Sequence, residues 1–90
     1  MYSIQATNQF RKDVKRCKKR GYDLSLLEQV IDLLQKTGTV PEKHRPHKLS
    51  GDYENCWECH IKPDWLLVWK QNDTELILLF IATGTHSDLF

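Results

Sequence analysis

Three histidines in the second half of the chain carry the side chain best suited to proton transfer near neutral pH. They are His47, at the start of His-Lys-Leu-Ser-Gly, His60, at the start of His-Ile-Lys-Pro-Asp-Trp, and His86, inside Thr-Gly-Thr-His-Ser-Asp-Leu-Phe near the end of the sequence. With Asp64 close behind His60, they supply the groups that an acid–base phosphodiesterase needs.

RNA is the substrate that such a set fits best, because it carries its own nucleophile, the 2′-hydroxyl. Its cleavage needs a base, an acid for the leaving 5′-oxygen and cations for the phosphorane charge, and no metal or other cofactor. The neighbouring side chains predict phosphate and base contacts: the cations Arg45, Lys48 and Lys62 for phosphates, and the aromatic residues Trp65 and Phe90 for stacking.

Each of these residues could also have a purely structural role. An isolated His60 on a strand is more often a surface histidine, and Asp64 after a proline is a common turn residue. Trp65 is more often part of a core, and Phe90 fits a simple anchor for the chain end. The fourth histidine, His44, is given no role.

The run Cys56-Trp57-Glu58-Cys59-His60 matches a haem-attachment motif, but its context argues against that chemistry. The segment reads as a strand, on which the two cysteines point to opposite faces about 10 Å apart and cannot form a disulfide. A zinc site is disfavoured as well, because structural zinc usually takes two ligand pairs on turns.

Length and composition predict one domain over residues 1–90. Hydrophobic residues make up 40% and charged residues 28% of the chain, which is typical of a globular protein. No apolar run approaches a membrane span, no signal peptide is evident, and the odd count of three cysteines suits reduced thiols. We therefore expect a cytoplasmic protein without a membrane partner.

The charge is divided unevenly along a chain whose net charge is only +1. Residues 1–50 carry +6 and residues 51–90 carry −5, and the densest positive stretch is 11–20. A basic face on a near-neutral protein suggests a polyanion or an acidic protein segment as partner, and its alternative is a solvated helix face.

Periodicity predicts two helices after a short β-prone start at 2–6. The first begins at Thr7 or Asn8 and ends at Gly21, with Phe10, Val14 and Cys17 on one apolar stripe. The second begins at Asp23 or Ser25, carries a broad apolar stripe, and stops at 37–39.

Residues 40–52 form a polar connection in which we expect a short strand at 47–49, and from Tyr53 onward the pattern becomes β. We expect strands at 56–61 and 65–70, a loop at 71–74, and an apolar, central strand at 75–82. The fold class is therefore α+β, with an N-terminal strand, a two-helix hairpin and an antiparallel meander of three to four strands. Alternation places Glu58 and His60 on the sheet face away from the helices, where His47 and His86 can join them.

These three histidine motifs, in this order and spacing, resemble the YafQ family of bacterial toxins, within the RelE/ParE superfamily of type II toxin–antitoxin systems. The resemblance covers nearly the whole chain, including the helical hairpin. It implies a RelE-like fold and a ribosome-dependent endoribonuclease, an mRNA interferase that inhibits translation. It also implies a DinJ-type antitoxin that neutralises the toxin, with operator DNA bound only through the complex.

Carried over residue by residue, the family's active site corresponds to five positions: His47, His60, Asp64, His86 and Phe90. The resemblance matches His86 to the key catalytic histidine, expected to be the general acid. His60 supported by Asp64 is the candidate base, His47 is an alternative base or a phosphate ligand, and Phe90 positions a base or sugar. Trp65 also matches the motif.

Two other functions fit the same fold. A ParE-like toxin would inhibit DNA gyrase without cleaving RNA, and it would have no need of three histidines. A binding module or co-repressor would keep the fold without catalysis.

Overall fold

The computed structural model describes residues 1–90, and its elements follow the predicted α+β order. They are β1 (Ser3–Ala6), α1 (Asn8–Lys19), α2 (Leu24–Thr37), β2 (His47–Lys48), β3 (Trp57–Lys62), β4 (Trp65–Asn72), β5 (Ile77–Gly84) and α3 (His86–Leu89). The strands form one five-stranded sheet in the order β1-β5-β4-β3-β2. The predicted fold class is confirmed, with one strand more than the meander alone supplies, because β1 pairs in parallel with β5.

Both long helices begin and end where their capping residues predict. The Thr7 side chain accepts a hydrogen bond from the Phe10 N–H at 3.0 Å, and Gly21 follows the α1 C-cap with a φ of +82°. Asp23 caps α2 by accepting from the Ser25 N–H at 3.0 Å, and Gly38 ends α2 in the left-handed region. Local capping chemistry therefore sets where both helices begin and end.

The turn between β4 and β5 differs from the prediction. The strand predicted at 75–82 is a central strand as expected, since β5 pairs with both β4 and β1, and β4 occupies the middle of the sheet. The β4–β5 turn lies later than predicted, because the Asn72 side chain accepts from the N–H groups of Thr74 and Glu75 at 3.0 and 2.9 Å. β4 thus extends to Asn72, and β5 begins at Ile77.

The main core fills the space between the sheet and the two long helices. It includes Phe10 against Phe80 at 5.5 Å between ring centroids, and the fully buried Cys59 of β3. Ile61 is buried in the same cluster, so the predicted alternation of β3 is confirmed. Apolar residues of β3 face the helices, and the residues between them face the other way.

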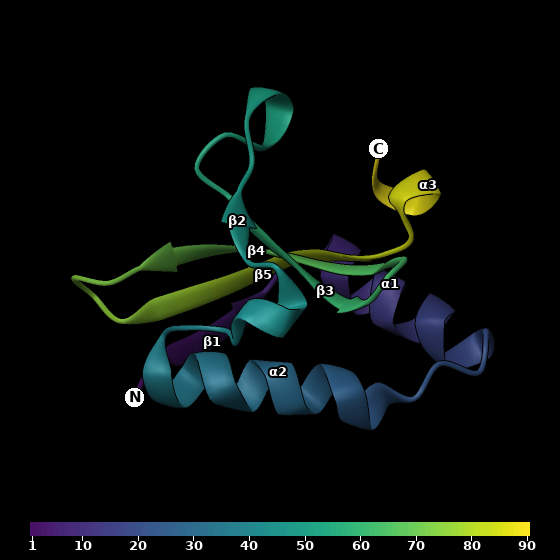
Figure 1. Ribbon diagram of the computed structural model, residues 1–90, viewed down its shortest axis with the longest axis horizontal. Coiled ribbons are helices and arrows are strands. Elements are labelled where there is room, and N and C mark those ends of the chain that lie inside the picture. The colour runs from purple at the N-terminus through teal and green to yellow at the C-terminus, as the bar shows by residue number, and fades with distance from the viewer.

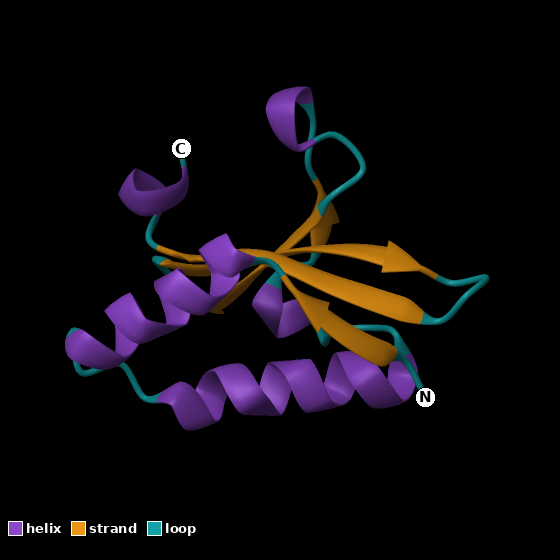
Figure 2. Ribbon diagram, turned by 180° about the vertical axis from the view of Figure 1, so that it is seen from behind, coloured by secondary structure: helices purple, strands orange, loops and turns teal.

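The opposite face of the sheet is covered only in part. Figures 1 and 2 show α1 and α2 on one side, and on the other side α3 and the loop between β2 and β3 rising from the sheet. A small second cluster lies at the base of these two projections, formed by Cys56, Val68 and Ala82. The two projections flank the part of the sheet where the histidines lie. None of the helices has the length and apolar character needed to cross a membrane.

Candidate active site

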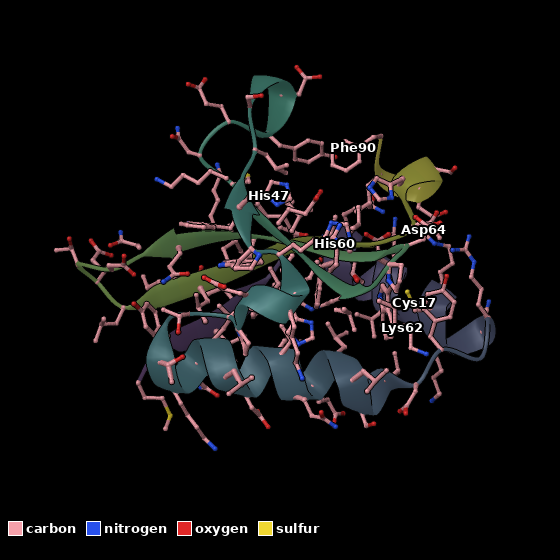
Figure 3. The ribbon with its side chains drawn as sticks, viewed as in Figure 1. Cys17, His47, His60, Lys62, Asp64 and Phe90 are labelled. Carbon is pink, nitrogen blue, oxygen red and sulfur yellow. The ribbon has the colours of Figure 1, made fainter.

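The three predicted histidines converge on the open face of the sheet. His47 comes from the edge strand β2, His60 from β3, and His86 from the first turn of α3. The ring centroids of His47 and His60 lie 6.4 Å apart, and those of His60 and His86 lie 5.9 Å apart. Figure 3 shows His47, His60, Asp64 and Phe90 on the same side of the molecule. The convergence expected from strand alternation is therefore present.

Asp64 holds His86 in place from the turn between β3 and β4. One carboxylate oxygen, Oδ1, accepts hydrogen bonds from the His86 backbone N–H at 3.0 Å and from its ring Nδ1 at 2.8 Å. These two bonds lower the pKa of Asp64, so the carboxyl stays ionised at neutral pH. Our expectation that Asp64 supports His60 is wrong, because the turn projects the carboxylate toward α3.

His60 has a different partner. Its Nδ1 lies 3.2 Å from the carbonyl oxygen of Pro63, within its own hairpin. A carbonyl can only accept, so this contact assigns the proton to Nδ1 and leaves Nε2 with a lone pair. His44 supports the same strand from outside the site, since its Nδ1 lies 2.8 Å from the His60 carbonyl oxygen.

Glu58 is a candidate site residue that the sequence interpretation did not select. It pairs with His47 across β2 and β3, and its Oε1 lies 3.3 Å from His47 Nε2. The residue is only 4% exposed, and its Oε2 is buried without a hydrogen-bond partner. The signal was available, because Glu58 precedes His60 by two residues and so shares its face.

His47 has an oxygen near each ring nitrogen. Its Nδ1 lies 2.9 Å from the carbonyl oxygen of Arg45, and its Nε2 lies 3.3 Å from Glu58 Oε1. A carbonyl can only accept, so Nδ1 carries a proton, and the Nε2–Glu58 contact is an ion pair only when the ring is protonated at Nε2 as well. The Arg45 backbone that supplies this carbonyl is in the left-handed region, with φ at +50°.

Phe90 lies at the rim of the site and is 61% exposed. Its ring meets Tyr53 of the β2–β3 loop edge-on, with centroids 5.3 Å apart and planes at 77°. The Tyr53 hydroxyl also reaches the carbonyl oxygen of Leu89 at 3.4 Å. These contacts join the two projections that flank the histidines, and Tyr53 is a second residue that sequence interpretation missed.

The predicted phosphate ligands lie in different places. Lys48 follows His47 on β2 and so points to the opposite face, where its ammonium lies 5.6 Å from the centre of the Trp57 ring. Lys62 lines two hollows, one with Tyr22 and Asp23 and the other with His60 and Arg45. The expected phosphate contact beside the histidines is therefore wrong for Lys48, and it stays a prediction for Lys62 and Arg45.

Trp65 is not available for base stacking. It is 3% exposed, packs against Tyr22 at 4.8 Å between ring centroids, and donates from Nε1 to Thr83 Oγ1 at 2.9 Å. The prediction of a substrate contact is wrong for this residue, because the first residue of β4 points into the helix-side core.

The cysteine motif forms no metal centre in this fold. All three cysteines are buried and free, and burial raises the pKa of the Cys59 thiol to about 12. No group of three or more histidine, cysteine or acidic side chains is arranged to hold a metal ion.

Comparison with known proteins gives a consistent picture. Residues 2–90 match the family model described as a bacterial toxin of type II toxin–antitoxin system, YafQ. The chain is 36% identical over 88 residues to the mRNA interferase toxin YafQ of Escherichia coli K12, covering 97% of this chain and 94% of that protein.

Solved structures agree with the sequence match. The fold superposes on YafQ in the E. coli DinJ–YafQ complex with a TM-score of 0.90 and 35% identity, covering 100% of this chain and 99% of that one. A metal-bound toxin from Helicobacter pylori gives a TM-score of 0.90 and 38% identity, with both chains fully covered. The chain therefore belongs to the YafQ family of toxins of type II toxin–antitoxin systems.

Proposed function

We propose that this toxin is an endoribonuclease that cleaves mRNA during translation by metal-independent acid–base catalysis. The observation that carries the proposal is the convergence of three imidazoles from β2, β3 and α3 on one open face, each with a defined partner. The E. coli relatives are mRNA interferases by name, which supports the same activity here.

His60 is suited to be the general base. Its Nδ1 faces the Pro63 carbonyl, which leaves the lone pair of Nε2 for the 2′-hydroxyl proton. The deprotonated 2′-oxygen then attacks the adjacent phosphorus, forms a 2′,3′-cyclic phosphate, and displaces the 5′-oxygen of the next nucleotide.

His86 is suited to be the general acid that protonates this leaving oxygen. The ionised carboxylate of Asp64 accepts from Nδ1 and fixes the ring orientation, which leaves Nε2 directed away from Asp64. Nε2 of the protonated ring is then the proton donor. With the side chain 56% exposed, the ring can reach an RNA strand laid across the face.

His47 and Glu58 are suited to phosphate charge rather than proton transfer. When the His47 ring is protonated, it lies between the Arg45 carbonyl and the Glu58 carboxylate and places a positive charge next to His60, where the phosphorane would form. Arg45 and Lys62 line a hollow with His60 and would add cations there. Phe90, supported edge-on by Tyr53, offers an exposed ring for stacking a base.

The partners follow from the same proposal. The ribosome would present the mRNA, and the exposed lysines and arginine of α1 would contact ribosomal RNA phosphates: Arg11, Lys12, Lys15, Lys18 and Lys19. A DinJ-type antitoxin would neutralise the toxin, as the DinJ–YafQ complexes of the relatives suggest. Operator DNA would be bound only through that complex, and the site of action would be the cytoplasm.

Induced expression of the wild type and of His86→Ala in bacteria, with mapping of new mRNA 5′ ends within minutes, tests the proposal. We expect cuts in translated messages that disappear in His86→Ala. Ser87→Ala is the matched control, because it truncates the exposed neighbour on the same helix and should retain the cuts. The same purified proteins on free RNA measure the need for the ribosome.

Growth arrest without new 5′ ends would contradict the proposal. If that arrest came with a DNA-damage response, a gyrase-binding toxin of the ParE type would be the better interpretation. Equal cleavage by His86→Ala and the wild type would remove His86 from the chemistry.

A further inference from the structure

Helix α3 contains His86 and is followed directly by Phe90, so it positions both residues. It has only four residues. Helix nucleation is unfavourable, and a helix of one turn has no stability of its own. The geometry of the active site therefore depends on what ties α3 to the rest of the molecule.

Asp88 is the residue through which most of these ties run. With Thr85 it forms a capping box, in which Asp88 Oδ2 accepts from the Thr85 N–H at 2.9 Å and Thr85 Oγ1 accepts from the Asp88 N–H at 3.1 Å. Its two carboxylate oxygens also accept two bonds from Arg20, at 2.6 Å from Nη1 and 3.0 Å from Nη2. Arg20 is the C-cap of α1, which is 68 residues away in sequence.

The Arg20–Asp88 pair has the two-pronged geometry in which guanidinium and carboxylate interact most strongly. The side chain of Asp88 is 14% exposed and that of Arg20 is 38% exposed, so the pair is partly open to solvent and its strength depends mainly on the two-bond geometry. The Arg20 guanidinium is the largest cause of the low pKa of Asp88, which agrees with a pair that is formed throughout the neutral range.

A second, buried link ties the middle of α1 to the end of β5. Asp13 is fully buried, and its carboxylate accepts from the Thr83 N–H at 3.1 Å and pairs with Arg16 at 3.1 Å. Arg16 in turn donates to the Thr83 carbonyl oxygen at 3.4 Å and lies 3.8 Å from Asp88. Residues of α1 thus contact the chain on both sides of Gly84, at Thr83 and at Asp88.

Gly84 lies so close to Asp88 and Arg16 that no side chain fits at this position. A Cβ at this position would lie 2.7 Å from Asp88 Oδ2 and 3.1 Å from an Arg16 nitrogen. Any side chain there would push the carboxylate away from Arg20.

From this geometry we infer that Arg20 is a positioning residue for catalysis, which acts through its paired bonds to Asp88 to hold α3, and with it His86, against the site. Two of the seven cations in α1 and its cap, Arg16 and Arg20, are then paired with carboxylates of the same chain, Asp13 and Asp88. The surface left for polyanions is correspondingly smaller than the sequence suggested.

The inference rests on the proposed nuclease function, and kinetics of cleavage of a defined mRNA in a reconstituted translation reaction test it. We expect Arg20→Ala to lower kcat about tenfold or more, with KM changed less than about twofold, because misplacement by about 1 Å can cost 100-fold. Arg20→Lys, which keeps the charge but loses the fork, should recover part of kcat. Lys36→Ala, an exposed cation on α2, is the charge-matched control and should behave as wild type.

A direct role of Arg20 in RNA binding gives a different result. In that case Arg20→Ala would raise KM with kcat intact, as expected for Lys19→Ala on the open side of α1, and the positioning role would be overturned. Asp88→Asn further distinguishes a positioning role of Arg20 from a direct role in RNA binding. It should reproduce the kcat loss of Arg20→Ala, and the double variant should be no worse than either single one; additive losses would overturn the coupling.

Amide hydrogen exchange of the free toxin supplies a readout that does not depend on cleavage. The Leu89 and Phe90 N–H groups bond to Thr85 and His86 carbonyls at 3.2 and 2.8 Å, so they report whether α3 is formed. We expect the Leu89 and Phe90 amides to exchange faster in Arg20→Ala and in Gly84→Ala than in the wild type, while the core amides exchange at the same rate. Unchanged exchange would overturn the inference even if the wild type cleaves mRNA. A wild type that fails to cleave would refute only the proposed function.

Discussion

Asp64 and His86 are joined by two hydrogen bonds to a single carboxylate oxygen, one from the backbone N–H and one from the ring. The backbone bond fixes the start of α3, and the ring bond fixes the tautomer and direction of the imidazole. One side chain of the β3–β4 turn therefore sets both the position and the protonation pattern of the candidate general acid.

Asp64→Asn tests the charge apart from the shape. The amide oxygen can still accept from the His86 ring and backbone, but it carries no negative charge to pair with the ring. We expect kcat for mRNA cleavage to fall about 100-fold, at the lower end of the range for general acid catalysis, with a small change in melting temperature. Cleavage kinetics and melting temperatures measured on the same samples make the test specific. A lower melting temperature with kcat unchanged would limit Asp64 to a structural role.

Glu58→Gln tests the buried carboxylate that faces His47. The substitution keeps the size of the side chain and removes the negative charge, so the protonated form of His47 would lose its charged partner. We expect weaker cleavage, by about tenfold, together with unchanged or higher stability, because one oxygen of this buried carboxylate has no hydrogen-bond partner at present.

The control for Glu58→Gln is Glu54→Gln in the exposed β2–β3 loop, which has the same change in charge and should cleave as wild type. Denaturant unfolding and single-turnover cleavage on the same samples separate stability from catalysis. A strongly destabilised Glu58→Gln with normal cleavage at low temperature would mean that Glu58 serves the fold and not the site.

The sequence predicted those parts of the fold and site that depend on local chemistry. The caps Thr7, Asp23 and Gly38, and the alternation that turns His60 to the open face, need only a few neighbouring residues. The partner of Asp64 could not be predicted in this way, because it depends on where β5 ends and on the helix that follows. A helix of four residues has no periodicity to detect.

Buried charge was the other feature hidden in the sequence. Asp13 sits in a run of cations and reads as a solvated helix residue, but it is fully buried on Thr83. Its importance depends on the parallel β1–β5 pairing that brings α1 beneath the end of β5. Trp65 was misassigned for a related reason, since only the register of β4 decides which side of the sheet it meets.

Trp65→Phe tests the assignment of this residue to the core. The change deletes the indole N–H that donates to Thr83 Oγ1 and leaves a small void. We expect a loss of about 1–3 kcal/mol in the free energy of unfolding. Cleavage should stay near wild type at temperatures where the variant is folded. Urea unfolding measures the free energy of unfolding. Trp57→Phe is the control, because the Trp57 ring is only partly buried. Lost cleavage with unchanged stability would restore a substrate contact for Trp65.

Acid should loosen α3 before it unfolds the core, and Asp88 gives the reason. The pKa of Asp88 is lowered in the folded protein, above all by Arg20, and that of Asp64 is lowered by its bonds to His86. A carboxyl whose folded pKa lies below its unfolded value, about 4, contributes stability above that value and loses it as the pH falls toward the folded pKa. We therefore expect melting temperatures that are flat from about pH 7 to 5 and decline below about pH 4.

Asp88→Asn identifies how much of that decline belongs to the Arg20 pair. Its melting temperature should be lower than that of the wild type at pH 7, and the difference should narrow as the pH falls, because protonation removes the same charge from the wild type. Asp32→Asn, on the exposed side of α2, should stay parallel to the wild type at every pH. Calorimetric scans at half-unit intervals from about pH 7 to 3 cover the window. A constant difference between Asp88→Asn and the wild type would show that the pair does not couple protons to folding, and that capping of Thr85 alone accounts for the role of Asp88.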